Sequence, residues 1–111
     1  MIPSQMLKGI LEGCILAVIS NKETYGYEIS EKLKGYGFDD ISEGTIYPLL
    51  QRLEKNGMVI SKMQASDLGP KRKYYSLSDK GRDEVAHFFD NYSAMSEAVM
   101  KVFNDLIRQR L

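Results

Sequence analysis

Tryptophan is absent from this sequence of 111 residues, cysteine occurs once, and the longest apolar run extends only from Cys14 to Ile19. A single cysteine excludes an intrachain disulfide and a cysteine-rich zinc site, and it favours a reducing compartment. The apolar run is far shorter than the roughly 20 residues that cross a bilayer. The first residues also lack the basic and then apolar order of a signal peptide. These absences predict a cytoplasmic protein with no membrane partner.

An excess of charge of either sign is lacking too, since fifteen basic residues balance fifteen acidic ones. The balance is uneven along the chain, because residues 52–82 hold eight basic and three acidic side chains, a local charge of +5. A neutral protein with one basic region is typical of a localised phosphate-binding face.

Catalytic and metal-binding patterns are missing as well. The sequence contains no glycine-rich phosphate loop and no pair of nucleophile and histidine at a structured turn. His87 is the only histidine, and it belongs to no recognisable set of metal ligands. We therefore expect no enzyme, no cofactor and no metal site. Cys14 is expected to be a small buried apolar residue rather than a redox sensor.

Hydrophobic periodicity predicts three helices in the first half of the chain. The first, Met6 to Ile19, is apolar nearly all round, which indicates a central helix that a partner subunit can share. The second runs from Tyr25 to Lys34, with Thr24 as its N-cap and glycines at its end. The third runs from about Glu43 to Asn56, with Ser42 as its cap and an apolar face of helical spacing.

Pro48 leaves the start of the third helix open. If that helix begins near Thr45, the proline lies in the first turn, where its missing N–H costs little. If it begins at Glu43, the hydrogen bond to Gly44 is lost and the helix should bend.

Two short segments rich in β-forming and aromatic residues follow, at Met58–Met63 and Arg72–Leu77. The residues between them include Gly69-Pro70, a turn signal, so we expect a β-hairpin. Three helices followed by a hairpin predict a mainly α fold, a winged helix-turn-helix, over residues 1–78.

In a winged helix-turn-helix the third helix enters the DNA major groove, which is about 12 Å wide, and the hairpin wing lies along the backbone. Small residues near the start of the helix let it approach closely, hydroxyl groups suit phosphates or base edges, and basic side chains suit phosphates. The alternative is that this polar face is merely solvated. The residues we assign to DNA are Ser42, Thr45, Tyr47, Pro48, Arg52, Lys71, Arg72 and Lys73.

Ser78 opens a last helix that continues almost to Leu111, and residues 79–111 carry an apolar heptad pattern. At 1.5 Å per residue this helix is roughly 45–50 Å long, and no other predicted helix matches it. We expect it to form a homodimer, because an unpaired stripe would be a large exposed apolar patch; the alternative is that it folds back on its own core. The residues assigned to the dimer interface are Val85, Phe88, Phe89, Tyr92, Met95, Val99, Val102, Phe103 and Leu106.

Three blocks of sequence, Tyr25–Ile29, Gly44–Gly57 and Gly69–Leu77, look like the signature blocks of PadR-type transcriptional regulators. The chain resembles that family from Met6 to Arg82, and its single C-terminal helix is similar to the short branch of the family. The resemblance implies a homodimeric winged-helix repressor that binds double-stranded operator DNA and releases it when an effector binds. It also implies DNA contacts by the matching residues of the third helix and the wing.

Some members of that short branch bind planar drugs between paired long helices, where an aromatic residue, often tryptophan, stacks on the ligand. The resemblance places Tyr92 at that position, with Phe89 one turn before it and Ser96 where an acidic partner can occur. It thus implies a planar aromatic effector, while packing in the dimer core is the alternative for both aromatic residues. Glu12 either faces water or supplies an acidic group to the effector pocket.

Two other functions fit the same residues. A winged-helix protein-interaction module would bind DNA weakly and without regard to sequence. A ligand sensor would have conventional DNA contacts and a pocket that dominates its role.

Overall fold

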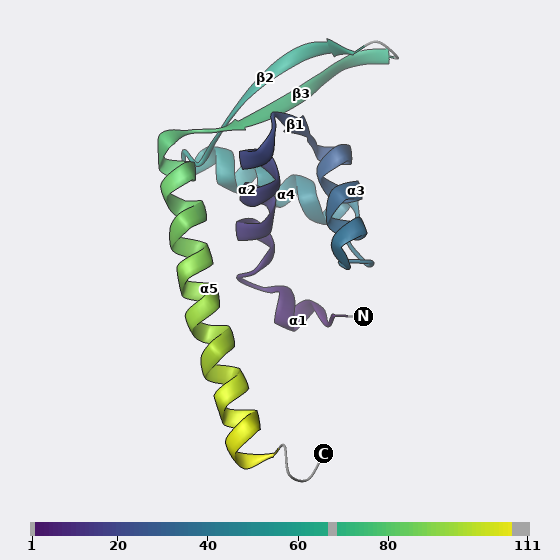
Figure 1. The fold of residues 1–111 in the computed structure, drawn as a ribbon. Coiled ribbons are helices and arrows are strands. Elements are labelled where there is room, and N and C mark those ends of the chain that lie inside the picture. The colour runs from purple at the N-terminus through teal and green to yellow at the C-terminus, as the bar shows by residue number, and fades with distance from the viewer. Residues whose placement is uncertain (1, 67–68, 108–111) are drawn as a thin grey trace.

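The computed structural model describes residues 2–66 and 69–107, which form five helices and three strands (Figure 1). The helices are α1 (Ser4–Leu7), α2 (Leu11–Asn21), α3 (Gly26–Tyr36), α4 (Glu43–Lys55) and α5 (Asp79–Leu106). The strands are β1 (Thr24–Tyr25), β2 (Val59–Ser66) and β3 (Gly69–Leu77). The expected mainly α fold with a hairpin wing and a long C-terminal helix is confirmed.

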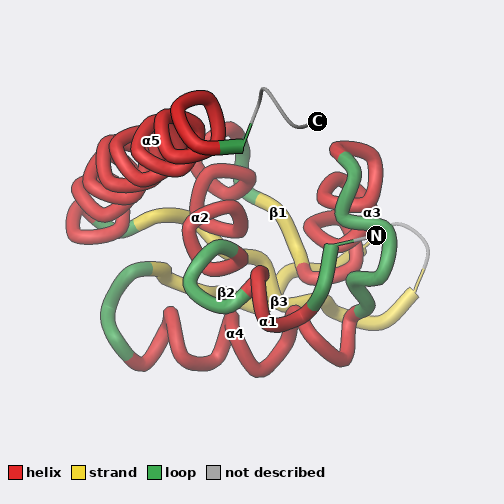
Figure 2. The backbone as a smooth tube through the Cα atoms, turned by 90° about the horizontal axis from the view of Figure 1, so that it is seen from below, coloured by secondary structure: helices red, strands yellow, loops and turns green. Residues whose placement is uncertain are grey.

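The first predicted helix is wrong in one respect, because the chain breaks it between α1 and α2. Gly9 lies in the break with φ of 81°, a left-handed backbone conformation that favours glycine. Only α2 is the central helix. It contacts α3, α4 and α5, and in Figure 2 it lies between α4 and α5.

Buried aliphatic side chains from α2, α3 and α4 form the core. Ile15, Ile29, Ile46 and Leu50 have no exposed surface, and Leu16 is only 1% exposed. These residues are the apolar positions that helical periodicity marks on each element. The core therefore fixes how the three helices cross, and with them the position of α4.

The start of α3 differs from the prediction. Thr24 is not an N-cap but belongs to β1, where it is paired with Tyr75 of β3. Its buried hydroxyl donates a hydrogen bond of 2.6 Å to Glu28. The helix ends two residues later than predicted, and Gly37, with φ of 119°, closes it in the left-handed conformation.

The helix α4 begins at Glu43, which settles the open question of its start. Pro48 is therefore inside the helix rather than in its first turn, and Gly44 loses the hydrogen bond that residue 48 would otherwise donate. Ser42 occupies the predicted cap position, but its side chain makes no capping hydrogen bond.

The wing is longer than predicted. β2 and β3 pair antiparallel, with Ser61 opposite Tyr75 and Met63 opposite Lys73, and the sheet order is β1-β3-β2. Gly69 and Pro70 lie within β3 rather than in a turn. Residues 67 and 68, which fall in the predicted connection, lie outside the described part of the chain.

The last helix, α5, leaves the winged unit and extends beyond it (Figure 1). Its 28 residues correspond to about 42 Å at 1.5 Å per residue. Ser78 caps its start by accepting a hydrogen bond of 3.0 Å from the backbone N–H of Gly81. The predicted residues 108–111 lie outside the described ones. None of the described helices is both long enough and apolar enough to span a membrane.

Candidate nucleic-acid interface

The helix α4 separates buried from exposed residues as its periodicity predicts. Ile46, Leu50 and Leu53 are buried, and the helix lies at the edge of the molecule opposite α5 (Figure 2). The residues assigned to DNA at its start and along it are all exposed, namely Ser42, Thr45, Tyr47, Pro48 and Arg52. This helix therefore presents a polar face to partners outside the subunit.

The position of the Tyr47 ring depends on Gly26, a residue that the sequence analysis did not assign to a site. A Cβ atom at Gly26, the first residue of α3, would lie 2.6 Å from Cε1 of the Tyr47 ring. Glycine at position 26 thus lets the ring lie against the start of α3, although 42% of the tyrosine remains exposed. Partial burial raises the pKa of its hydroxyl, and the Glu43 carboxylate raises that pKa further. The hydroxyl stays protonated and can donate a hydrogen bond.

The three basic residues of the wing differ in their surroundings. Lys71 and Lys73 are two residues apart on β3 and point to one face of the sheet, whereas Arg72 points to the other. The Arg72 guanidinium lies 4.5 Å from the centre of the Tyr25 ring, a cation–π contact that orients it. The Nζ atom of Lys73 lies 2.8 Å from Oε1 of Glu54.

A hollow of about 500 Å³ joins α4 to the wing, and we call it the wing hollow. It brings Tyr47 together with the wing cations, as a surface that follows a phosphate backbone requires. Its lining residues are Tyr25, Gly26, Tyr27, Glu43, Tyr47, Lys71, Arg72 and Lys73.

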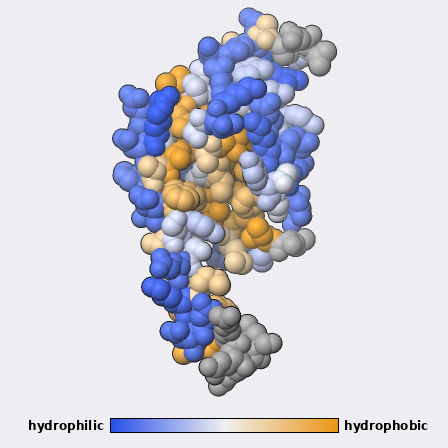
Figure 3. Space-filling model, in the orientation of Figure 1, coloured by the Kyte–Doolittle hydropathy of each residue, from blue (hydrophilic) through white to orange (hydrophobic). Residues whose placement is uncertain are grey.

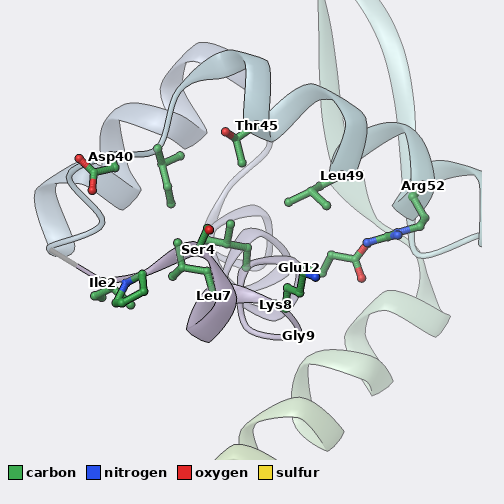
Figure 4. A pocket seen from close by; sticks show the side chains of 13 residues that line it. Ile2, Ser4, Leu7, Lys8, Gly9, Glu12, Asp40, Thr45, Leu49 and Arg52 are labelled. Atoms are coloured by element: carbon green, nitrogen blue, oxygen red, sulfur yellow. The ribbon is translucent and has the colours of Figure 1, made fainter.

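Thr45 and Arg52 lie on the other side of α4, away from the wing hollow. They line a second hollow of about 690 Å³ beneath the N-terminal residues, shown in Figure 4. The Nε atom of Arg52 lies 2.6 Å from Oε1 of Glu12 in α2. Glu12 therefore lines this hollow and pairs with a residue assigned to DNA, so it does not simply face water.

Glu54 was not among the residues assigned to a site. Its Oε2 accepts a hydrogen bond of 2.5 Å from Ser61, and its Oε1 binds Lys73. Both hydrogen bonds lower the pKa of the Glu54 carboxyl below its ordinary value. The only signal in the sequence was an acidic residue within the basic stretch 52–82.

Two of the residues assigned to a dimer interface pack against other residues of the same subunit. Val85 packs against the core, and the Phe88 ring occupies the space where a Cβ atom at Gly13 would lie. The remaining ones are exposed over 42–68% of their surface: Phe89, Tyr92, Met95, Val99, Val102, Phe103 and Leu106. The exposed part of the apolar stripe therefore begins at Phe89.

The residues of α5 assigned to an effector follow Phe88 along the helix, and one of them contacts its ring. The Tyr92 ring stacks on the Phe88 ring with their centroids 6.1 Å apart. Phe89 is exposed over 68% of its surface, and Ser96 is partly buried. Tyr92 is thus in contact with α2 through Phe88, whose ring lies against Gly13.

Metal and thiol chemistry have no support in the described residues. No group of three histidine, cysteine, aspartate or glutamate side chains among them could hold a metal ion. Burial raises the pKa of the Cys14 thiol, which is opposite to the shift that a reactive cysteine needs.

Comparisons with known proteins agree with this architecture. A model of the transcriptional regulator PadR-like family matches residues 15–87. The crystal structure of a PadR-like transcriptional regulator from Bacillus cereus is 49% identical, with a TM-score of 0.81, and the match covers 89% of this chain and 96% of that one. A transcriptional regulator from Mycobacterium tuberculosis is 34% identical over 68 residues, which are 61% of this chain and 62% of that protein.

A further solved structure contains DNA. Bacillus subtilis PadR in complex with operator DNA is 25% identical to this chain, with a TM-score of 0.65. The match covers 72% of this chain and 47% of that one. The family model spans more than half of the chain and contains α3, α4 and the wing. The chain therefore belongs to the PadR-like family of transcriptional regulators.

Proposed function

We propose that this regulator is a homodimeric repressor that binds a two-fold-related operator and releases it when a small molecule binds near Tyr92. The observation that carries DNA binding is the wing hollow, which an exposed tyrosine of α4, the recognition helix of this proposal, lines together with the basic residues of the wing. A relative of the same fold, Bacillus subtilis PadR, was solved in complex with operator DNA, which supports DNA binding by this chain.

Each copy offers two kinds of DNA contact in this proposal. Thr45 and Pro48 of α4 enter the major groove, with Ser42 at its rim. Tyr47 of α4 and the wing residues Lys71 and Arg72 bind phosphates. Arg52 can reach a phosphate only by leaving Glu12, so its contribution depends on that ion pair. If Lys71, Arg72 and a released Arg52 of each copy each neutralise one phosphate, about six phosphates per dimer give a slope near −5 for log K against log salt concentration.

The exposed stripe on α5 supports the homodimer. Met95, Val99 and Phe103 are each about half exposed on a helix that extends beyond the rest of the subunit. Apolar side chains also gather over α2 on the face shown in Figure 3, framed by polar residues. A second copy that packs on α5 and on this face buries both surfaces, which a monomer would leave as an unusually large apolar patch.

Release by an effector has a physical route through the subunit. Tyr92 stacks on Phe88, the Phe88 ring lies against Gly13, and the neighbouring Glu12 binds Arg52 of α4. A planar aromatic molecule that stacks on Tyr92 would displace Phe88 and change the position of α2. The Glu12–Arg52 ion pair would carry that change to the recognition helix.

Selection of duplexes from a random library with the full chain tests the proposal. We expect an enriched sequence with two-fold symmetry, bound as a retarded complex that survives excess unrelated duplex. Binding that is weak, lost at moderate salt and indifferent to sequence would instead indicate a protein-interaction module. Melting shifts with planar aromatic molecules, compared between wild type and Tyr92→Ala, test the effector.

A further inference from the structure

One carboxylate ties both strands of the wing to the recognition helix. Glu54 projects from the second half of α4 and uses its two oxygen atoms for different strands. Oε2 accepts the hydrogen bond from Ser61 of β2, and Oε1 accepts the one from Lys73 of β3, at 2.8 Å. We call Glu54, Ser61 and Lys73 together the wing clamp. Since each strand is held separately, the hairpin can neither slide along α4 nor lift from it without breaking a hydrogen bond.

The clamp also decides which wing cations are available to DNA. Lys73 is bound to a carboxylate, whereas Lys71, which points to the same face of β3, forms no salt bridge within residues 2–66 and 69–107. Glu54 raises the pKa of the Lys73 amine, and Lys73 lowers the pKa of the Glu54 carboxyl. The two shifts agree that both groups are charged and paired at neutral pH.

The pairing of Lys73 with Glu54 affects both the number of phosphate contacts and the position of the wing. Phosphate contacts strengthen binding to every duplex equally, so each additional one raises non-specific affinity as much as specific affinity. Selectivity comes from base-edge contacts, which require that the recognition helix and the wing keep a fixed relative position. Withholding one phosphate ligand therefore lowers the affinity for every duplex, and the wing that the clamp fixes against α4 is what favours the operator over other DNA.

We propose that Glu54 is a specificity-determining positioning residue, which keeps Lys73 from the phosphate backbone and fixes the wing against α4. The inference rests on the proposed function, because it presumes that α4 and the wing bind DNA. Lys73 is then a structural part of the interface, and Lys71 and Arg72 are its phosphate ligands.

The salt dependence of binding to the selected operator separates these roles. Lys71→Ala should flatten the slope of log K against log salt by about 0.9 per subunit, whereas Lys73→Ala should flatten it by less than half as much. Glu54→Gln keeps the length of the side chain and its capacity for hydrogen bonds but loses the charge, and a neutral amide holds an ammonium group more weakly. This variant should steepen the slope, bind unrelated duplex severalfold more tightly and lower the ratio of operator to unrelated affinity.

A double-mutant cycle excludes a general effect of charge. If Glu54→Gln acts only by freeing Lys73, it should leave the salt slope unchanged in a Lys73→Ala background. A full effect in that background would mean that any lost negative charge suffices, and it would overturn the inference. Equal flattening by Lys71→Ala and Lys73→Ala would overturn it as well, because Lys73 would then be an ordinary phosphate ligand.

Titration of the Glu54 carboxyl by NMR tests the clamp directly in the full chain. Its pKa should rise in Lys73→Ala, and in wild type it should stay low after the operator is added. A rise on DNA binding would show that Lys73 leaves for a phosphate, which contradicts the proposal. If the wild-type chain selects no duplex, the proposed function fails and this inference fails with it. Selective binding to the operator without the expected salt slopes would refute this inference and leave the proposed function standing.

Discussion

Substitution of Gly26 by alanine tests how the recognition-helix tyrosine is positioned. The new Cβ atom would lie 2.6 Å from Cε1, 2.8 Å from Cζ and 2.9 Å from the hydroxyl oxygen of Tyr47. Carbon atoms in contact prefer a separation of about 3.5–4.0 Å, so the ring must move by roughly 1 Å. Because the ring is the exposed end of a flexible side chain, we expect it to move outward with little cost. The free energy of unfolding should change by less than about 1 kcal/mol.

The effect on DNA binding should be larger. A hydrogen bond from Tyr47 to a charged phosphate contributes about 1.5–3 kcal/mol, and each 1.4 kcal/mol is a factor of ten in Kd. Loss of that contact in both half-sites of a dimer should weaken binding to the selected operator at least tenfold. Fluorescence anisotropy of the labelled duplex measures the Kd, and thermal melting measures stability on the same preparations.

Gly35→Ala is the matched control, since it makes the same change in the same helix. A Cβ at Gly35 meets nothing within 4 Å, so this variant should gain about 0.5–1 kcal/mol of stability and keep the wild-type Kd. In a Tyr47→Ala background, Gly26→Ala should add little further loss. Wild-type operator affinity in Gly26→Ala would refute the role that we assign to the contact between Gly26 and Tyr47.

Three further predictions follow from other contacts. Gly81→Ala should lower the free energy of unfolding by about 2–3 kcal/mol in a denaturant melt, because its Cβ would meet the backbone carbonyl of Met58, which cannot rotate away; a wild-type melting curve would refute this. Ending the chain after Asp90 keeps Val85 and Phe88 on the core but removes most of the exposed stripe, so light scattering should show a monomer with an intact circular dichroism spectrum; a stable dimer would contradict the role of α5. The Glu54–Lys73 pair should stabilise the fold at neutral pH. Because the pKa of the Glu54 carboxyl is lowered in the folded state, this contribution is lost as the pH falls below the ordinary value of 4.5. Because the pKa of the Lys73 amine is raised, the contribution is also lost as the pH rises above 10.5. Melting temperatures from pH 3 to pH 7 should therefore fall more steeply on acidification in wild type than in Glu54→Gln.

Helical periodicity predicted the elements that bury one face. Ile46, Leu50 and Leu53 of α4 are buried as their spacing requires. The heptad pattern predicted a C-terminal helix that extends beyond the winged unit, as α5 does. Local signals of this kind depend only on neighbours within the same element. They failed at the break before α2, because the apolar positions fit one long helix as well as two and the sign of the break is Gly9 itself.

The contacts that define the site join residues that are distant in the sequence. Arg52 forms an ion pair with Glu12, forty positions away, and Lys73 forms one with Glu54, nineteen positions away. The strand β1 has only two residues, and it exists because β3 pairs with it. Composition and spacing could therefore predict which residues carry charge on α4 and the wing, but not which of these charges are already paired with carboxylates.

The most direct test of the account is hydroxyl-radical footprinting of the full chain on the duplex that it selects. Two recognition helices held by paired α5 helices should protect two half-sites whose centres lie about 10 base pairs, or roughly 34 Å, apart, or a multiple of that spacing on the same face. A footprint with a single protected site, or half-sites on opposite faces of the duplex, would contradict it.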